Sequence, residues 1–317
     1  MRAGFIAIVG LPNVGKSTLL NHILGQKLAI VAPRPQTTRN RILGVRNYPD
    51  AQLVLIDTPG LHRPSGTHRT ELNRFMVDEV MQAVAAVDAV LLLVEAPTGP
   101  EAKVIAERGY SPGTAYGHLL QAVADAKKPT IVAVNKIDLL HNKRALLPIL
   151  DAWNKKHDFT ALMPISAATG EGVELLEAEL CKLLPEQERL FPEEMLTDRA
   201  ERWLAAEMVR EQVFILTRQE IPYAVAITLD SYSERPAEGK KKVADVMIEA
   251  TIHVEKEQQK KIVVGEGGRM VREIGARARL EISHLLDCPV HLKLFVRVDA
   301  GWTQTPSGLR KMGYGDE

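Results

Sequence analysis

Short apolar runs alternate with amphipathic segments of helix length along the first part of the chain. The apolar runs are 5–9, 53–56, 89–94, 131–134 and 161–165, and the helical patterns are 16–24, 69–86, 118–126, 144–155 and 172–184. A continuous apolar run of this length bounded by turns is typical of a strand buried on both faces. The alternation predicts an α/β fold with a doubly wound, mostly parallel sheet. Residues 41–46 can add an antiparallel edge strand.

The pattern changes after residue 185. Residues 185–195, "PEQERLFPEEM", carry two prolines and several glutamates, which suits a linker. Beyond them we expect a helix at 198–216, strands at 223–229 and 245–254, two helices around 265–268, and a strand at 290–298. The sequence therefore predicts a first domain at 1–185, a linker at 186–197 and a smaller α+β domain with a C-terminal tail at 198–317. Residues 97–117 are rich in glycine and proline and predict a surface excursion of the first domain.

Composition narrows the class of protein. The 317 residues hold 40 basic and 40 acidic side chains, so any nucleic-acid surface must be local. Cys181 and Cys288 are the only cysteines, with no CxxC spacing, which indicates a reducing, cytoplasmic setting. The longest apolar stretch, 83–94, contains Asp88 and is too short to cross a bilayer. We expect no transmembrane segment.

The stretch "GLPNVGKST" follows the first predicted strand and opens the first predicted helix. It satisfies the pattern G-x-x-x-x-G-K-[ST] of a P-loop, whose backbone N–H groups surround phosphates. The lysine neutralises phosphate charge, the serine ligates Mg²⁺, and the N-terminal end of the helix faces the anion. The residues that we expect to bind the phosphates are Gly10, Asn13, Val14, Gly15, Lys16, Ser17 and Thr18.

Two later segments favour guanine as the base. "NKID", Asn135 to Asp138, ends a predicted parallel strand, where α/β sheets bind ligands. The Asp138 carboxylate can accept hydrogen bonds from both donors of guanine, and adenine offers neither in that arrangement. We expect Asn135 to contact the guanine edge and Lys136 to cover the ring. In "SAATG", Ser166, Ala167 and Ala168 are the candidates, with the Ala167 N–H beside guanine O6.

Two further segments fit the parts that respond to the γ-phosphate. "DTPG" places Asp57 to hold Mg²⁺ and the Gly60 N–H to meet the γ-phosphate. "RPQTTR" lies where a threonine must reach Mg²⁺, and we choose Thr38, with Thr37 as the reserve. The predicted metal ligands are therefore Ser17, Thr38 and Asp57, and the predicted catalytic residues are Lys16, Thr38, Gly60 and Asn13.

With these motifs in place, the first domain resembles the TrmE–Era–Der branch of bacterial translation GTPases, through "GLPNVGKST", "PQTTR" and "DTPGLH". The branch departs from the Ras-like pattern, because Leu61 stands where a glutamine would orient the attacking water. The resemblance therefore implies slow intrinsic turnover. It also implies that Asn13 can hold a K⁺ ion beside the phosphates; the alternative is an asparagine that only shapes the loop.

The second domain resembles a type II KH domain. "KKIVVGEGGRMVREIGARAR", 260–279, resembles its GXXG region, and "VHLKLFVRV…GW" resembles the end of the Era family within that branch. In KH domains this loop clamps the backbone of about four nucleotides. The predicted RNA-binding residues are Lys260, Lys261, Gly265, Glu266, Gly267, Gly268, Arg269 and Arg272. Glu266 is unexpected beside phosphate, so either it points away or Arg269 compensates.

The resemblance implies a GTP-hydrolysing switch that binds the 3′ end of 16S rRNA during small ribosomal subunit assembly. It implies GTP or GDP and Mg²⁺ as ligands, and peripheral association with the membrane, for which no amphipathic anchor in the sequence argues. We expect a monomer. The alternative is an RNA-binding protein that uses GTP mainly as a structural ligand with negligible hydrolysis. A tRNA-modifying or large-subunit GTPase of the branch would need a cysteine-containing tail or a second nucleotide domain, which the sequence lacks.

Overall fold

The computed structural model describes residues 1–32, 34–61, 70–98, 110–140, 142–217, 221–236 and 243–315. The chain divides into two compact units. The first contains Met1–Ala29, Thr38–Pro64 and Met76–Asp198, and the second contains Ile30–Thr37, Ser65–Phe75 and Arg199–Glu317. Most of the excursion expected at 97–117 lies outside the described residues.

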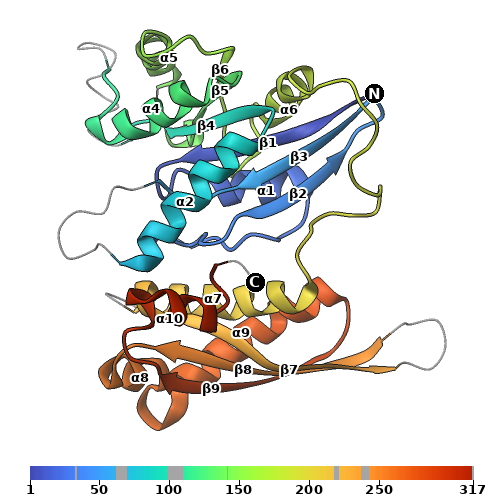
Figure 1. Ribbon diagram of the computed structural model, residues 1–317, viewed down its shortest axis with the longest axis vertical. Coiled ribbons are helices and arrows are strands. Elements are labelled where there is room, and N and C mark those ends of the chain that lie inside the picture. Colours follow the sequence, from blue (N-terminus) through green and yellow to red (C-terminus); the bar gives the residue numbers. More distant parts are fainter. Residues whose placement is uncertain are drawn as a thin grey trace. The chain divides into compact units, whose positions relative to one another are not determined.

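A six-stranded sheet forms the centre of the first unit, in the order β2-β3-β1-β4-β5-β6 (Figure 1). Its strands are β1 (Arg2–Gly10), β2 (Ile42–Asn47), β3 (Ala51–Asp57), β4 (Ala89–Glu95), β5 (Thr130–Asn135) and β6 (Ala161–Pro164). β2 pairs antiparallel with β3, and the remaining neighbours pair parallel. The doubly wound sheet with an antiparallel edge strand is confirmed.

Helices cover both faces of this sheet. They are α1 (Lys16–Leu24), α2 (Glu71–Ala86), α4 (Gly117–Ala126), α5 (Leu146–Asn154) and α6 (Val173–Lys182). Buried residues of α2, α4 and α5 pack with alternate residues of the central strands, such as Val9, Leu92 and Val134. α1 contacts β1, β2 and β3, and α6 contacts β1 and β3. Because β1, β3, β5 and β6 run in the same direction, the loops that follow these strands meet at one edge of the sheet.

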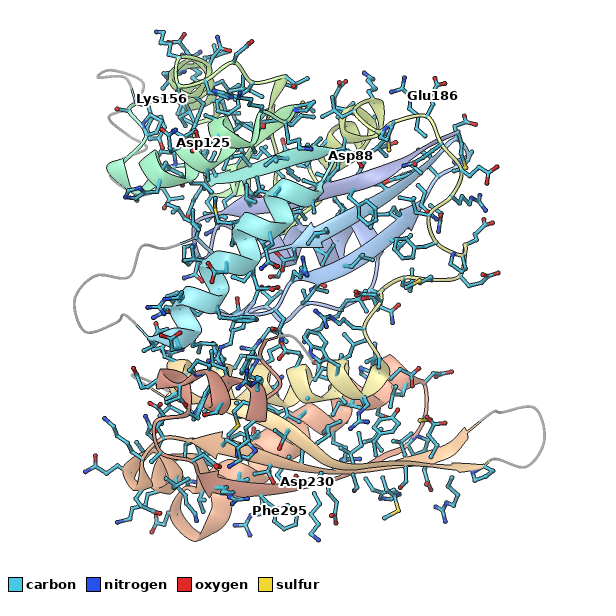
Figure 2. All side chains as sticks on the ribbon, viewed as in Figure 1. Asp88, Asp125, Lys156, Glu186, Asp230 and Phe295 are labelled. Atoms are coloured by element: carbon cyan, nitrogen blue, oxygen red, sulfur yellow. The ribbon has the colours of Figure 1, made fainter. Side chains whose placement is uncertain are left out.

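The segment expected to be a linker is bound along the first unit. Gln52, which is fully buried on β3, donates to the Phe191 carbonyl (2.8 Å) and accepts from the Phe191 N–H (2.9 Å). The Val45 N–H donates to the Leu196 carbonyl (2.8 Å). Glu186, labelled in Figure 2, pairs with Arg2 at the start of β1. These contacts fix the backbone of a segment whose composition predicts a linker.

The second unit has a three-stranded sheet in the order β7-β8-β9. β7 (Ala226–Pro236) runs antiparallel to β8 (Val243–Val254), and β9 (Val290–Val298) runs parallel to β8. The helices are α7 (Glu201–Leu216), α8 (Glu257–Val264), α9 (Arg269–Leu286) and α10 (Pro306–Lys311). The predicted α–β–β–α–α–β order is confirmed; the basic run at 240–242 lies outside the described residues. Phe295 lies on β9 (Figure 2). Its side chain is 42% exposed.

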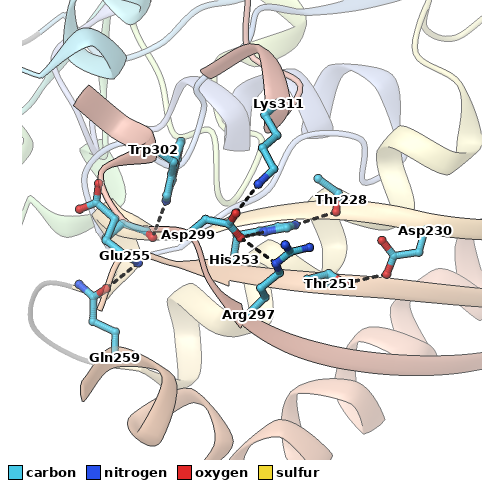
Figure 3. Close-up of polar contacts among 11 residues, drawn as sticks. Thr228, Asp230, Thr251, His253, Glu255, Gln259, Arg297, Asp299, Trp302 and Lys311 are labelled. Atoms are coloured by element: carbon cyan, nitrogen blue, oxygen red, sulfur yellow. Dashed lines mark hydrogen bonds and ion pairs between the residues drawn. The ribbon is translucent and has the colours of Figure 1, made fainter. Parts of the chain in front are cut away.

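Polar contacts fasten the C-terminal segment to this sheet (Figure 3). The Asp299 carboxylate, just after β9, bonds to Nδ1 of His253 on β8 (2.7 Å) and to Lys311 of α10. The Trp302 indole donates to the Ala224 carbonyl (3.2 Å). Burial alone would raise the pKa of Asp299, but the bonds from Lys311 and His253 outweigh it and lower the pKa. This cluster holds α10, which the sequence patterns do not predict.

Candidate nucleotide-binding and RNA-binding sites

The P-loop connects β1 to α1 in a conformation that requires glycine at two points. Gly15 has φ 102°, and a Cβ there would lie 2.3 Å from Nδ2 of Asn135. A Cβ at Gly10 would lie 2.4 Å from the Leu93 carbonyl oxygen. Asn13 is exposed and has φ 63°, a left-handed conformation that asparagine tolerates better than most residues. The backbone alone thus gives a reason for asparagine at position 13.

Lys16 lies at the start of α1 and is almost fully buried. Its ammonium donates to the carbonyl oxygens of Gly10 (3.3 Å) and Leu11 (3.0 Å). Burial lowers the pKa of Lys16 to about 8, although the nearby Asp57 carboxylate opposes the shift. A bound anion would stabilise the charged form of Lys16. The loop therefore holds a cation that a bound phosphate would stabilise.

The predicted metal ligands come together from three separate segments. The Ser17 hydroxyl lies 2.8 Å from the Thr38 hydroxyl and donates to Oδ2 of Asp57 (2.7 Å), and the Thr38 hydroxyl also donates to Oδ2 (3.1 Å). Asp57 is fully buried, and its Oδ1 has no hydrogen-bond partner within the described part of the chain. Burial raises the pKa of Asp57, against the effects of Lys16 and the two hydroxyls.

Such a group of oxygens fits a hard divalent cation. Mg²⁺ prefers oxygen ligands, and a buried carboxylate oxygen without a partner is costly unless a cation or water meets it. The structure brings Thr38 to this point, whereas the carbonyl of Thr37 is bound elsewhere, by Arg210. The arrangement supports Thr38 over the reserve Thr37.

The segment after β3 packs closely against the P-loop. The Thr58 hydroxyl donates to the Ile8 carbonyl (2.8 Å), and the Leu61 N–H donates to the Gly10 carbonyl (3.1 Å). A Cβ on Gly60 would lie 2.8 Å from the Cα and N of Pro12. The Leu61 side chain packs against the apolar core. Leu61 therefore has an apolar packing role, and Gly60 is held against the loop that is expected to hold the phosphates.

Asn135 makes two buried hydrogen bonds within the protein. Its side chain is buried, donates to the Val14 carbonyl (2.7 Å) and accepts from the Ala167 N–H (2.8 Å). It thereby joins the P-loop to the segment after β6. Contacts of Asn135 and of the Ala167 N–H with guanine stay predictions. The bracing role was missed because an NKxD pattern suggests the base alone.

The other predicted base-binding residues differ in their exposure to solvent. Asp138 is exposed, and Lys136 forms an ion pair with Glu95 at the end of β4 (2.9 Å). Ser166 is buried, and its hydroxyl accepts from the Thr169 N–H (3.2 Å). Ala168, two residues after Ser166, is exposed, as are Thr169 and Asp138. The Asp138 carboxylate is therefore accessible to a ligand.

The GXXG loop joins α8 to α9. Gly265, Gly267 and Gly268 have φ values of 70°, 57° and 77°, which residues other than glycine rarely adopt. A Cβ at Gly265 would lie 2.7 Å from Cβ of Met270. The Arg272 guanidinium donates to the Gly267 carbonyl (2.9 Å). The loop is thus shaped by glycine and supported by one of the predicted RNA-binding cations.

The charged residues of this region lie at the surface. Lys261, Glu266, Arg269 and Arg272 are exposed, and Lys260 is half-buried. The side chains of Ile262 on α8 and Leu280 on α9 are about half exposed, at 47% and 53%. A glycine-shaped loop with exposed cations and apolar side chains can take both the phosphates and the bases of a single strand.

Comparison with known proteins gives the family. The pattern of the family described as "50S ribosome-binding GTPase" matches residues 5–136, and that of the KH domain matches residues 220–303. GTPase Era of Syntrophus aciditrophicus is 46% identical over 315 residues, covering 99% of this chain and 96% of the relative. The chain belongs to the GTPase Era family. GTPase Era of Geobacter metallireducens is 44% identical, with coverage of 99% and 98%.

Solved Era structures match over the full length. A crystal structure of Era in complex with MgGDPNP and nucleotides 1506–1542 of 16S ribosomal RNA has a TM-score of 0.89 and 38% identity, covering 100% of both chains. A variant of Aquifex aeolicus Era bound to GDP·AlF4⁻ gives the same TM-score, identity and coverage. The P-loop GTPase domain followed by a KH domain is therefore confirmed, as is membership of a GTPase family.

None of the described helices combines the length and the apolar character needed to cross a membrane.

Proposed function

We propose that this chain is a GTP-hydrolysing switch whose KH domain binds the 3′ end of 16S rRNA and which acts in small ribosomal subunit assembly. The observation that carries the proposal is that one chain holds both the Ser17, Thr38 and Asp57 oxygen cluster and a GXXG loop with left-handed glycines. A relative with 38% identity was solved with MgGDPNP and 16S rRNA nucleotides 1506–1542.

In this proposal each part of the nucleotide contacts a separate loop. Lys16 and the P-loop N–H groups bind the phosphates, and Asp138 accepts hydrogen bonds from guanine. Ser17, Thr38 and Asp57 would hold Mg²⁺, which neutralises phosphate charge when bound. Gly60 would meet the γ-phosphate through its N–H. Loss of the γ-phosphate would release the Thr38 and Gly60 loops, which gives the switch its two states.

Hydrolysis must proceed without a water-orienting glutamine. Leu61 packs against the core and cannot hydrogen-bond to water, so catalysis rests on charge stabilisation and intrinsic turnover is slow. Asn13 is exposed on the P-loop and is the candidate ligand for K⁺. Turnover measured in K⁺ and in Na⁺ tests this candidate. A faster rate in K⁺ that is lost in Asn13→Gly supports it, whereas equal rates in both salts remove K⁺ from the proposal.

The alternative function, RNA binding with GTP as a structural ligand, makes a different prediction. A variant of a relative with 38% identity was solved with GDP·AlF4⁻, an analogue of the phosphoryl-transfer state. That complex favours hydrolysis over the alternative for this chain. Single-turnover hydrolysis with and without RNA separates the two readings. A measurable hydrolysis rate that falls in the Thr38→Ala variant supports the switch. A negligible rate both with and without RNA supports the alternative.

RNA binding can be tested with an oligonucleotide of the 16S 3′ end and a scrambled control, each with a non-hydrolysable GTP analogue or GDP. We expect preference for the 3′-end sequence, a steep loss of affinity with salt, and a difference between the two nucleotide states. Gly268→Asp, which puts a carboxylate at a left-handed loop position, should abolish binding without affecting GTP binding. Equal affinity for the scrambled RNA would contradict the proposed target.

We also propose that the protein works in the cytoplasm, where GTP and ribosomal precursors are present. Peripheral binding at the inner face of the membrane is the further location that the resemblance implies. Co-sedimentation of the purified protein with anionic lipid vesicles tests it directly; a protein that stays in the supernatant at low salt does not bind membranes peripherally.

A further inference from the structure

Helix α7 carries two adjacent charged residues that are almost completely buried. Arg210 and Glu211 are each only 1% exposed. Burying a charge is costly unless hydrogen bonds and opposite charges compensate for the lost water. The partners of these two side chains therefore indicate what the two buried charges do.

Arg210 has one ionic partner and one backbone partner. Its Nε donates to Oε1 of Glu207, one turn earlier on α7 (2.7 Å), and its Nη2 donates to the other Glu207 oxygen. The same Nη2 donates to the carbonyl oxygen of Thr37. The guanidinium lies over the Phe214 ring, 5.2 Å from its centroid. The Glu207 carboxylate, the Thr37 carbonyl and the Phe214 ring thus fix the position of this guanidinium, and one of these three groups belongs to the segment Ile30–Thr37.

Glu211 holds the opposite end of the same segment. Its Oε1 accepts a hydrogen bond from the Val31 N–H (2.8 Å). Ile30–Thr37 belongs to the same compact unit as α7, although in sequence it lies within the nucleotide-binding domain. The two buried charges of α7 therefore hold backbone groups at both ends of Ile30–Thr37.

Thr38, the next residue, belongs to the other compact unit and contacts the metal site. The Thr37 carbonyl and the Thr38 N–H share one planar peptide group. A donor that fixes the Thr37 oxygen therefore also fixes the orientation of the peptide that leads into Thr38. The Thr38 hydroxyl in turn lies beside Ser17 and Asp57.

We propose that Arg210 is a positioning residue for GTP hydrolysis: it holds the Thr37 carbonyl and so orients the Thr38 hydroxyl for the metal. The inference rests on the proposed role of Thr38 as a metal ligand. Arg210 acts through the backbone of Ile30–Thr37, which belongs to the same compact unit as α7. Arg210 does not itself touch the nucleotide.

The test compares Arg210→Met, Arg210→Lys, Thr38→Ala and the double variant Arg210→Met with Thr38→Ala in the full chain. The measurements are the single-turnover rate of GTP hydrolysis, the Mg²⁺ concentration that gives half the maximal rate, and GDP affinity. Val213→Ala, which truncates a fully buried α7 residue of the second core, controls for loss of stability alone. A further variant, Arg210→Met with Glu207→Gln, avoids leaving an unpaired carboxylate.

Arg210→Met should slow hydrolysis by about tenfold or more and raise the required Mg²⁺, because it removes a hydrogen bond from a charged donor. GDP affinity should stay within about twofold, and Arg210→Lys should recover part of the rate. In the Thr38→Ala background, Arg210→Met should have no further effect. Val213→Ala should leave the Mg²⁺ requirement unchanged.

Two outcomes overturn different statements. If Thr38→Ala hydrolyses GTP at the normal rate and Mg²⁺ requirement, the proposed role of Thr38 fails. If Thr38→Ala is impaired but the folded Arg210 variants keep the normal Mg²⁺ requirement, or if the two effects simply add, only the inference about Arg210 fails.

Discussion

Replacing Asn135 with alanine should destabilise the first unit even when no nucleotide is present. In the structure the Asn135 amide satisfies the buried Val14 carbonyl at 2.7 Å and the Ala167 N–H at 2.8 Å. Asn135→Ala leaves both backbone groups without this partner. A purely base-contacting asparagine would instead affect only nucleotide affinity.

The size of the effect follows from those two groups. A buried polar group left without a hydrogen bond costs about 1–3 kcal/mol, so two of them cost about 2–6 kcal/mol. Water that reaches the site would place the result near the lower end of that range. A loss of about 2 kcal/mol corresponds to roughly 30-fold faster exchange of amides that open with the whole unit.

Hydrogen exchange measured by mass spectrometry on nucleotide-free protein is the suitable assay, because peptides from β5 and α1 report on the first unit alone. The control is Asp138→Ala, which removes an exposed carboxylate three residues after Asn135. It should leave exchange unchanged, since exposed substitutions seldom change stability by more than about 0.5 kcal/mol. It should nevertheless weaken guanine nucleotide binding. Normal exchange in Asn135→Ala together with weak GDP binding would refute the bracing role.

Three further predictions concern single side chains. Because burial lowers the pKa of Lys16 to about 8 and a bound anion raises it again, nucleotide binding above pH 8 should take up protons, and affinity should fall as pH rises through 8. Calorimetry in buffers of different ionisation enthalpy measures this uptake, and zero uptake would show that Lys16 is already charged. Gly60→Ala, whose Cβ would meet Pro12 at 2.8 Å, should slow hydrolysis by about tenfold or more while GDP affinity changes less than threefold; normal single-turnover rates would remove Gly60 from the switch. Glu266→Lys should tighten RNA binding and steepen its salt dependence, with the exposed Glu257 at the other end of α8 changed to lysine as the control; equal affinities at every salt concentration would place Glu266 away from phosphate.

Regular elements could be predicted from the sequence because their apolar periodicity is strong. The helix pattern at 16–24 matches α1, and the alternation at 290–298 matches β9. The P-loop, DTPG and NKID motifs lie at the ends of β1, β3 and β5 as expected. Each of these signals is local in sequence, and sheet topology then brings the motifs to one edge.

Contacts between distant polar residues could not be predicted in this way. Gln52 binds the linker backbone at Phe191, and Asn135 braces the P-loop at Val14. The pattern of apolar and polar residues marks such side chains only as polar and does not indicate their hydrogen-bond partners. The helix α10 is short and depends on contacts such as that of Lys311 with Asp299, so it has little periodicity of its own.

The division of the chain also depends on long-range contacts. The predicted boundary near residue 198 lies beside the division between Asp198 and Arg199, but Ile30–Thr37 groups with the second unit. Arg210 and Glu211 hold this segment, at separations of 173 and 180 residues. No motif in the sequence marks these two residues as partners of the threonine loop.

Exchange of Asp138 for asparagine tests the central claim, that this carboxylate selects guanine for the P-loop. Guanine presents two donors to the carboxylate, whereas xanthine presents one donor and one acceptor, which match an asparagine amide. Asp138→Asn should lose GDP affinity by about a hundredfold and bind xanthosine diphosphate more tightly than GDP. If the variant binds GDP within threefold of the original chain and shows no preference for the xanthine nucleotide, the assignment of the base site is wrong.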